Sequence, residues 1–436
     1  MRISIVILLI FLFPTNVFSL EIKEWEMPNG LHVIFAPYRR LPAVTVQVWY
    51  HAGSKDERPG IRGVAHMFEH MMFKGTQHVR PEHHAQFLTA LGGTINAFTT
   101  EDITAYHNTV PNQYFEFAVL LEAERMRNLL LTNKTIKSER EVVKEEKRLH
   151  LENSPIGRSL ETIRALAYNK HPYRWTPAGD IPDLNRVTPA DCQDFYNTFY
   201  VPNNASLIVV GDVTEEQVKE ITNKYFGPIP KGKTPPRFAP NEPIQTEQRV
   251  QQGDWPSQLT VLLGAYHVPS ANHQDIPAIR VLDSILSAGH SSRLHQALVR
   301  KKKLSLAAGS FLHSLEHPGL FYIYSLGLPI HEVQEIKDAL LQEIEQIAKH
   351  AVTKEELSKA KNQLASRYLE GMKTIWGLAN NIGMSVYLQG DPRAFLDMET
   401  KLDRVTVEDV ERIAKTYLVP SNSSFVLVSG GIGGVK

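Results

Sequence analysis

Short apolar or alternating runs predict β-strands in both halves of the chain. Most are rich in β-branched and aromatic residues, which favour a pleated, half-buried surface. The predicted strands cover residues 31–35, 43–50, 94–99, 104–110, 258–266 and 319–326. Apolar positions at helical spacing predict helices between them. These helices cover residues 81–91, 114–131, 333–350 and 355–372.

One stretch of the sequence recurs in a similar form. Residues 187–211 read VTPADCQDFYNTFYVPNNASLIVVG, and residues 405–429 read VTVEDVERIAKTYLVPSNSSFVLVS. Because the copies lie 405 − 187 = 218 residues apart, too far for a solenoid unit, they indicate duplicated domains. The prolines between the copies predict an extended linker. The expected division is a first domain over 20–227, a linker over 228–255 and a second domain over 256–436.

The first residues differ from the rest of the chain. An apolar run over residues 3–13 follows a basic start and is too short for a typical membrane span. This pattern predicts a secretory signal peptide over 1–19, and the alternative is an uncleaved anchor. We therefore expect an exported protein, periplasmic or secreted, with no membrane span after signal removal. The one cysteine, Cys192, excludes an internal disulfide and is expected to pack inside a helix.

Residues 64–72 read VAHMFEHMM and contain the motif His-x-x-Glu-His. The segment is apolar nearly all round, which predicts a buried helix. On a helix His66 and His70 lie one turn apart on one face, where two neutral imidazoles can hold a zinc ion. Glu69 lies close to that face and could accept a proton from the attacking water. The alternative is a surface helix with chance histidines, since the chain has 18.

A second charged stretch, IKSEREVVKEEKRL over residues 136–149, shows a helical stripe. Glu139 and Glu146 are expected on the packing face of this helix. The apolar residues assigned to the same face are Ile136, Val142, Val143 and Leu149. A carboxylate on a packing face needs a partner, and a metal ion is one solution. Two histidines, a distant glutamate and an open fourth position are typical of a catalytic zinc site.

These residues resemble the inverted zincins related to pitrilysin, insulin-degrading enzyme and the mitochondrial processing peptidase, among them the short, two-domain bacterial members. Glu146 follows His70 by 146 − 70 = 76 residues, and Glu139 stands seven residues before it. The resemblance implies one Zn²⁺ per chain, bound by His66, His70 and Glu146, with Glu69 as general base. Glu139 would orient the site. The implied fold class is α+β, with two homologous domains that each form a mostly antiparallel sheet covered by helices.

The resemblance also suggests how substrate binds. Asn96-Ala97-Phe98 resembles an edge strand on which a substrate peptide adds as an extra strand through main-chain hydrogen bonds. The alternative is an ordinary hairpin strand.

Residues 277–287 occupy the place of the zinc helix in the second half and lack the motif, so the chain is expected to have one zinc site. His78, His83 and His84 form no ligand set and are expected at the surface, whereas residues 171–180 are expected to form a structural loop.

A departure from the family pattern suggests a partner chain. Many members carry in the second half a substrate-binding arginine and, seven residues later, a tyrosine. Here Arg300 stands at the arginine position, but residue 300 + 7 = 307 is Ala307. We therefore expect a heterodimer in which a homologous sister chain supplies the tyrosine.

The expected activity is that of a zinc metalloendopeptidase that cuts peptides or unfolded proteins. One alternative is a non-catalytic scaffold subunit of a larger complex, and another is a zinc hydrolase of a non-peptide substrate. The 47 acidic and 47 basic side chains give no support for nucleic-acid binding.

Overall fold

The computed structural model describes residues 20–237, 241–350 and 352–431. The predicted signal peptide over 1–19 lies outside these residues. The first half of the chain forms a six-stranded sheet with the order β1-β2-β6-β3-β5-β4. Its strands are β1 Lys23–Glu26, β2 His32–Pro37, β3 Ala43–Tyr50, β4 Thr94–Thr99, β5 Thr104–Pro111 and β6 Ala205–Gly211. β4 is an edge strand, paired with β5 alone among the described strands.

The second half forms a five-stranded sheet with the order β7-β11-β8-β10-β9, which repeats the order β2-β6-β3-β5-β4 of the first. Its strands are β7 Arg249–Gln252, β8 Thr260–Val268, β9 Ser305–His313, β10 Gly319–Gly327 and β11 Ser423–Val428. In each sheet one pair is parallel, β2 with β6 and β7 with β11, and the other described pairs are antiparallel. The expected duplicated α+β fold is confirmed.

β7 lies within residues 228–255, which the proline content predicts as linker. The linker prediction is wrong for this strand, because Arg249–Gln252 pair with β11 as the counterpart of β2. A four-residue polar strand has too little apolar pattern to be recognised beside so many prolines. The boundaries of the two domains remain a prediction.

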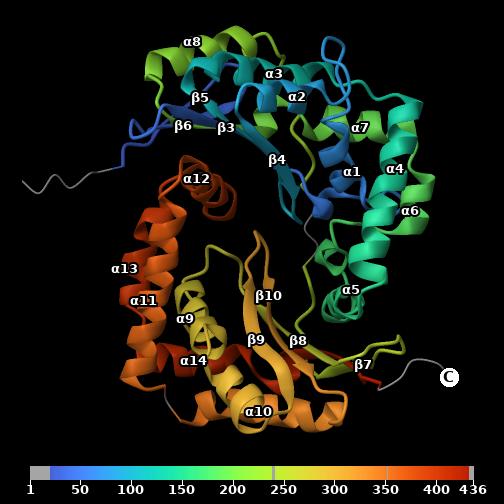
Figure 1. Ribbon diagram of the computed structural model, residues 1–436, viewed down its shortest axis with the longest axis vertical. Coiled ribbons are helices and arrows are strands. Elements are labelled where there is room, and N and C mark those ends of the chain that lie inside the picture. The colour runs from blue at the N-terminus through green and yellow to red at the C-terminus, as the bar shows by residue number, and fades with distance from the viewer. Residues whose placement is uncertain (1–19, 238–240, 351, 432–436) are drawn as a thin grey trace, which may run out of the picture.

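Helices cover both sheets (Figure 1). In the first half they are α1 Val64–Met71, α2 His83–Ala90, α3 Phe115–Asn128, α4 Asn133–Lys147, α5 Pro155–Ala167, α6 Ile181–Arg186, α7 Pro189–Phe199 and α8 Glu215–Tyr225. In the second half they are α9 Ile276–Ser287, α10 Val333–Lys349, α11 Lys354–Gly371, α12 Ile375–Gln389, α13 Met398–Asp403 and α14 Val407–Tyr417. The repeated sequence forms α7 with β6 and α14 with β11, and Thr188 and Thr406 cap the two helices in the same way.

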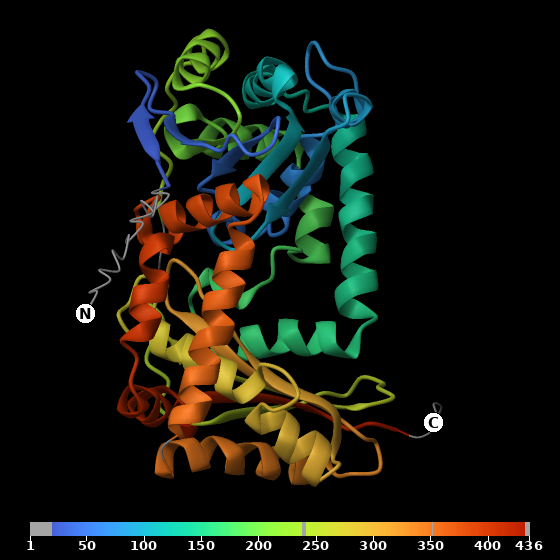
Figure 2. The same cartoon turned by 60° about the vertical axis from the view of Figure 1, so that its left-hand side comes forward.

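The two halves exchange one helix each. Alternate residues of a strand point to opposite faces, so Val33 packs with the helices of the first half while Ile34 packs against α12. In return, α5 of the first half covers the second sheet, where Ile163 contacts the core formed by Val261 and Leu263. Figures 1 and 2 both show α12 against the upper sheet and α5 against the lower one. Each sheet is therefore buried on both faces by helices from both halves.

Three surface or packing predictions are wrong. His84 is buried, because the face of α2 that carries it packs inward beside the buried Glu122. Val142 is 40% exposed and Leu149 57% exposed. The packing face of α4 holds Ile136, Glu139 and Val143, and Leu149 falls in a following π-helical turn, η3 (Arg148–Glu152), which changes the helical phase.

Cys192 is buried in α7 as expected. Among the described helices, none is both long and apolar enough to cross a membrane.

Candidate metal centre

α1 carries the His-x-x-Glu-His motif against the core. Val64, Ala65, Met67, Phe68 and Met71 are buried and hold the helix on the sheet. This leaves the face with the two histidines half-buried. The imidazole rings of His66 and His70 have their centroids 4.9 Å apart and stand nearly perpendicular, at 87°. The predicted helix and its shared histidine face are therefore present.

α4 packs beside α1 and brings Glu146 to the two histidines. The Glu146 Oε2 atom lies 3.4 Å from His70 Nε2 and 3.8 Å from His66 Nε2. Ligand atoms of His66, His70 and Glu146 all lie within 4.8 Å of one another, the one such group of three or more in the described residues. Two imidazole nitrogens and one carboxylate oxygen form a donor set that zinc uses at catalytic sites, so these residues fit a zinc ion.

Glu139 lies seven residues before Glu146 on α4, which is about two helical turns. Its side chain is buried, with Oε2 3.8 Å from His70 Nδ1 and Oε1 3.4 Å from the ammonium of Lys74. Lys74 also pairs with Glu82 at 2.6 Å. Glu139 thus touches the side of the His70 ring that faces away from Glu146. A carboxylate in that position favours one tautomer and one orientation of the imidazole.

Glu69 projects beside β4. Burial raises the pKa of its carboxyl group, and the negative charge of Glu146 acts in the same direction. A hydrogen bond from Thr99, the last residue of β4, and the nearby His70 oppose this shift of the pKa. Burial also lowers the pKa of His66 to about 4, which keeps its imidazole neutral at neutral pH. The predicted base therefore lies between the histidine pair and the exposed edge of the sheet.

The β4 residues expected to bind substrate lie on this edge. Asn96 and Phe98 pair with His107 and Ala105 of β5, and the other side of β4 has no strand partner among the described residues. The Phe98 ring packs edge-on against the buried Trp49, with centroids 5.4 Å apart. Asn96 is exposed, and its side-chain oxygen accepts a hydrogen bond from Ala97 N. An edge strand anchored by a buried aromatic pair offers a fixed template for a further strand.

Sequence reasoning missed Glu57, which caps α1. Its carboxylate accepts hydrogen bonds from Gly63 N and Ala65 N, both 2.9 Å long. Gly63 has φ of +98°, a left-handed conformation that glycine adopts without strain. Burial raises the pKa of Glu57 to about 8. The loop between Glu57 and the helix hides the cap, because ordinary capping signals are read within three residues of the helix start.

Arg300 does not join the metal centre. It is exposed in a π-helical turn, η6 (His295–Lys301), and makes no hydrogen bond or ion pair within the described residues. Ala307 lies in β9, paired with Leu326. Between them Lys303 has φ of +54°. The π-helical turn and the left-handed residue separate Arg300 from Ala307, so the seven-residue spacing between them does not run along one regular element.

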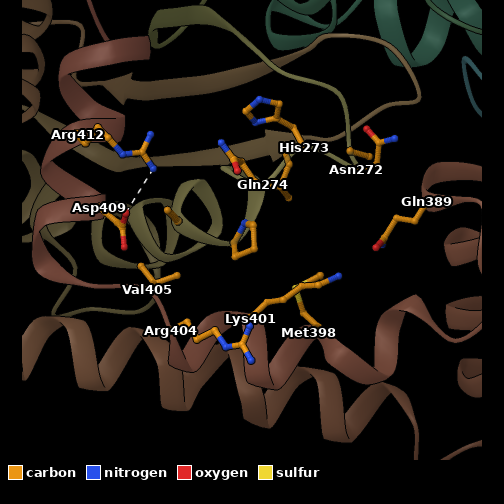
Figure 3. A pocket seen from close by; sticks show the side chains of 14 residues that line it. Asn272, His273, Gln274, Gln389, Met398, Lys401, Arg404, Val405, Asp409 and Arg412 are labelled. Carbon is orange, nitrogen blue, oxygen red and sulfur yellow. Dashed lines mark hydrogen bonds and ion pairs between the residues drawn. The ribbon is translucent and has the colours of Figure 1, made fainter.

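Another cavity, of about 290 Å³, lies at the start of α9 and is separate from the metal centre (Figure 3). Arg412 there pairs with Asp275 at 2.8 Å and lies 3.4 Å from Asp409. The guanidinium of Arg412 is therefore already neutralised by carboxylates of the protein.

Comparison with known proteins gives matches along both halves. The family model described as insulinase (peptidase family M16) covers residues 35–176, and the model described as the peptidase M16 inactive domain covers 186–364. The zinc protease PqqE of Helicobacter pylori is 31% identical over 407 residues, which are 92% of this chain and 91% of that protein.

Solved structures share the fold. A protease from Helicobacter pylori has a TM-score of 0.90 at 30% identity and covers 94% of this chain and 99% of that chain. The periplasmic protease PqqL from Escherichia coli has a TM-score of 0.76 at 18% identity, and the match covers 95% of this chain but 48% of that chain. The resemblance to the inverted zincins is thus confirmed along nearly the whole length, and the chain belongs to peptidase family M16.

Proposed function

We propose that this protein is a zinc metalloendopeptidase. The observation that carries the proposal is the convergence of His66, His70 and Glu146, with Glu69 on the same helix and next to an exposed strand edge. A zinc ion bound by the two histidines and Glu146 would supply Lewis acidity to the scissile carbonyl and would lower the pKa of nearby water. The relatives named as zinc proteases support this assignment.

Residues of the chain would transfer the proton, orient His70 and bind the substrate. Glu69 would accept a proton from the attacking water at its carboxylate and pass it to the leaving amine. Glu139 would hold His70 in one orientation through the Nδ1 side of the ring. The outer edge of β4 at Asn96-Ala97-Phe98 would bind an extended peptide by main-chain hydrogen bonds, which gives affinity with little sequence preference.

Peptide cleavage by the zinc-loaded chain tests this function. A mixed quenched-fluorescent peptide library is the substrate, and the Glu69→Gln variant is the matched blank. The expected result is cleavage by the native chain and none by Glu69→Gln, although the variant still binds one zinc ion. Cleavage retained by Glu69→Gln would contradict the role of Glu69. Failure of the native chain to bind zinc would instead favour the non-catalytic scaffold subunit.

The match described as an inactive domain covers 186–364 and includes α9, which lacks the motif. It therefore fits a metal-free second half beside a catalytic first half. A periplasmic location is proposed from the predicted signal peptide and from the similarity to a protease named as periplasmic. N-terminal sequencing of the exported protein tests it, and a chain that still begins at Met1 would contradict signal cleavage.

We further propose a homologous sister chain as partner. Support comes from the exposed, unpaired Arg300 and from the match to PqqL, of which this chain covers 48%. A second unit of similar size would complete the length of that protein. Co-purification should recover a sister chain that restores cleavage to an inactive isolated protein. Full activity of this chain alone, in a preparation that holds no other polypeptide, would contradict the need for a partner.

A further inference from the structure

The second half contains a cavity at the place that corresponds to the metal centre. α9 packs against β9 and α11 as α1 packs against β4 and α4. Thr132 caps α4 and Thr353 caps α11, both with a capping box, so the two helices can be aligned by their caps. Glu146 lies 146 − 132 = 14 residues after the first cap, and 353 + 14 = 367 is Arg367. An arginine therefore replaces the metal-binding glutamate in the duplicate.

The inward face of α9 also carries charge. Arg280 and Asp283 are three residues apart, which places them on one face of the helix. With Arg367 of α11 they line a cavity of about 400 Å³ between α9, α11, α12 and β9. We call this cavity the arginine pocket. Figure 1 shows α9, α11 and α12 on the left of the molecule, whereas α1 and α4 lie on the right.

The two arginines of the pocket interact electrostatically with Asp283 but form no direct pair with it. Neither Arg280 nor Arg367 makes a hydrogen bond or an ion pair within the described residues, and the buried Nε of Arg280 is unsatisfied. Asp283 is engaged elsewhere, because one of its carboxylate oxygens accepts hydrogen bonds from Ser310 at 2.6 Å and Ser287 at 3.3 Å. Burial raises the pKa of Asp283, and its hydrogen bonds with Ser310 and Ser287 and the charges of Arg280 and Arg367 oppose that shift. Arg367 is exposed and Arg280 is half-buried, with its buried Nε unsatisfied. Two guanidinium groups thus face one carboxylate, and the remaining positive charge favours an anion in the pocket.

Most of the remaining lining is apolar or aromatic, with Asn381, Ser385 and Gln389 of α12 as polar exceptions. The apolar and aromatic residues include Phe311, Leu364, Tyr368, Met384 and Leu388. A volume of about 400 Å³ lies in the range of small-ligand sites and accommodates one or two amino-acid residues. Planar guanidinium groups pair with carboxylates through two parallel hydrogen bonds, a geometry that suits a carboxylate at the end of an apolar residue.

We propose that the arginine pocket binds the C-terminal carboxylate of a peptide, with Arg280 and Arg367 as the anion-binding groups and the apolar lining around the last side chain. The identification of the ligand as a peptide rests on the proposed peptidase function. The pocket lies in the half without the metal residues, so it anchors the end of the chain away from the site of cleavage.

Binding of paired peptides tests the proposal. Two fluorescent peptides of one sequence, ending in phenylalanine as the free acid or as the amide, are titrated into zinc-loaded Glu69→Gln protein and followed by anisotropy. The acid should bind at least about tenfold more tightly than the amide. The double variant Arg280→Gln/Arg367→Gln should remove this preference, and Arg280→Lys/Arg367→Lys should retain part of it, because charge remains without the planar geometry.

Arg404→Gln is the matched control, since Arg404 is an exposed arginine that lines the separate cavity of Figure 3. It should leave the preference unchanged, and circular dichroism of every variant checks the fold. Equal binding of acid and amide, no saturable binding of the acid, or a preference that survives in the glutamine double variant would overturn the proposal. Succinate that binds more tightly than the peptide would overturn the peptide as the source of the carboxylate.

The outcome is separable from that of the proposed function. A chain that cleaves no peptide but shows the acid preference would retain the pocket and lose the peptidase assignment. A chain that cleaves peptides and binds acid and amide equally would retain the peptidase assignment and lose the pocket.

Discussion

The side chains of the metal centre are positioned in different ways. His66 and His70 are fixed relative to each other by one helical turn, whereas Glu146 reaches them from another helix. Glu139 acts one contact further out, against His70 Nδ1 and Lys74. Such outer contacts commonly change metal affinity without abolishing it.

Substitution of Glu139 should therefore weaken zinc binding. In Glu139→Gln the neutral amide supports the His70 imidazole less well, and we expect a loss of about 10–100-fold in zinc affinity with one zinc ion still bound. Competition against a chromophoric chelator measures this. Glu141→Gln, an exposed glutamate on the same helix, is the control and should bind zinc as the native chain does. Equal affinities for both variants would contradict the orienting role.

Glu57 should make stability depend on pH. In the folded chain its pKa is raised to about 8, whereas the unfolded value is 4.5. Between pH 4.5 and 8 the folded state holds a proton that the unfolded state has lost, so this group lowers the free energy of unfolding as the pH rises. Its contribution is largest below pH 4.5 and is lost by pH 8, with a magnitude on the order of a few kcal/mol.

Denaturant unfolding between pH 5 and pH 8 tests this contribution. The curve of Glu57→Gln should fall less steeply with pH than that of the native chain, because glutamine does not titrate. Glu145→Gln, an exposed glutamate, is the control and should keep the native slope. Parallel curves for Glu57→Gln and the native chain would show that the carboxyl group is ionised throughout, stabilised by the two N–H donors of α1.

At the scale of elements, the exchanged helices α5 and α12 decide how the sheets are covered. α12 lies on the face of the first sheet that the local helices leave open, where Ile382 and Ala379 meet Ile34 and Trp49. The Tyr387 hydroxyl also donates a hydrogen bond to Trp49 O at 2.7 Å. The packing is close enough that one position of α12 has room only for glycine.

Gly383→Ala should destabilise the protein, although alanine favours helices. A Cβ atom at Gly383 would lie 2.3 Å from Trp49 Cε2, and the indole is fully buried and cannot move aside freely. We expect a loss of about 1–3 kcal/mol from overpacking, against a gain of about 1 kcal/mol in helix propensity. Gly371→Ala is the control, because its Cβ would meet only the flexible amide of Asn381, at 3.3 Å. Thermal unfolding of both variants measures the difference, and a stabilised Gly383→Ala would contradict the close packing.

At the scale of the whole molecule, the halves meet through polar groups as well as the exchanged helices. Arg164 of α5 and Glu101 of the β4–β5 turn form a buried pair at 2.5 Å, and His313 of the second half lies 3.3 Å from the same glutamate. Close by, Asp102 accepts hydrogen bonds from the Tyr173 hydroxyl and from Glu316 N. The pKa of Glu101 is held far below its usual range, chiefly by the charge of Arg164 against the effect of burial.

Breaking the buried pair should cost far more than breaking an exposed pair between the halves. Glu101→Gln leaves Arg164 buried without its partner, and we expect a loss of about 3–5 kcal/mol in the free energy of unfolding. Glu24→Gln removes the partner of Arg393, an exposed pair that joins the first half to the second, and should cost about 0–1 kcal/mol. Urea unfolding compares the two variants, with small-angle X-ray scattering as a check on separation of the halves. Equal losses would contradict the greater cost of leaving a buried charge unpaired.

The sequence by itself determined the local features of this protein. Helical spacing fixes the shared face of His66 and His70, strand periodicity marks β3 and β10, and the repeat of α7–β6 in α14–β11 reveals the duplication. The helical stripe of α4 indicates Glu139 and Glu146, although it wrongly includes Val142 and Leu149, and the family resemblance assigns the two glutamates their roles. These features depend on residues within one element or on a comparison of two segments.

Only the tertiary structure decided which segments meet. The capping of α1 by Glu57, the exchange of α5 and α12, and the convergence of Arg280 and Arg367 join residues across loops or across halves. No periodicity encodes such contacts, because they arise when two separately formed surfaces pack together and exclude water. The duplication was therefore readable along the chain, whereas the exchange of helices between its halves was not.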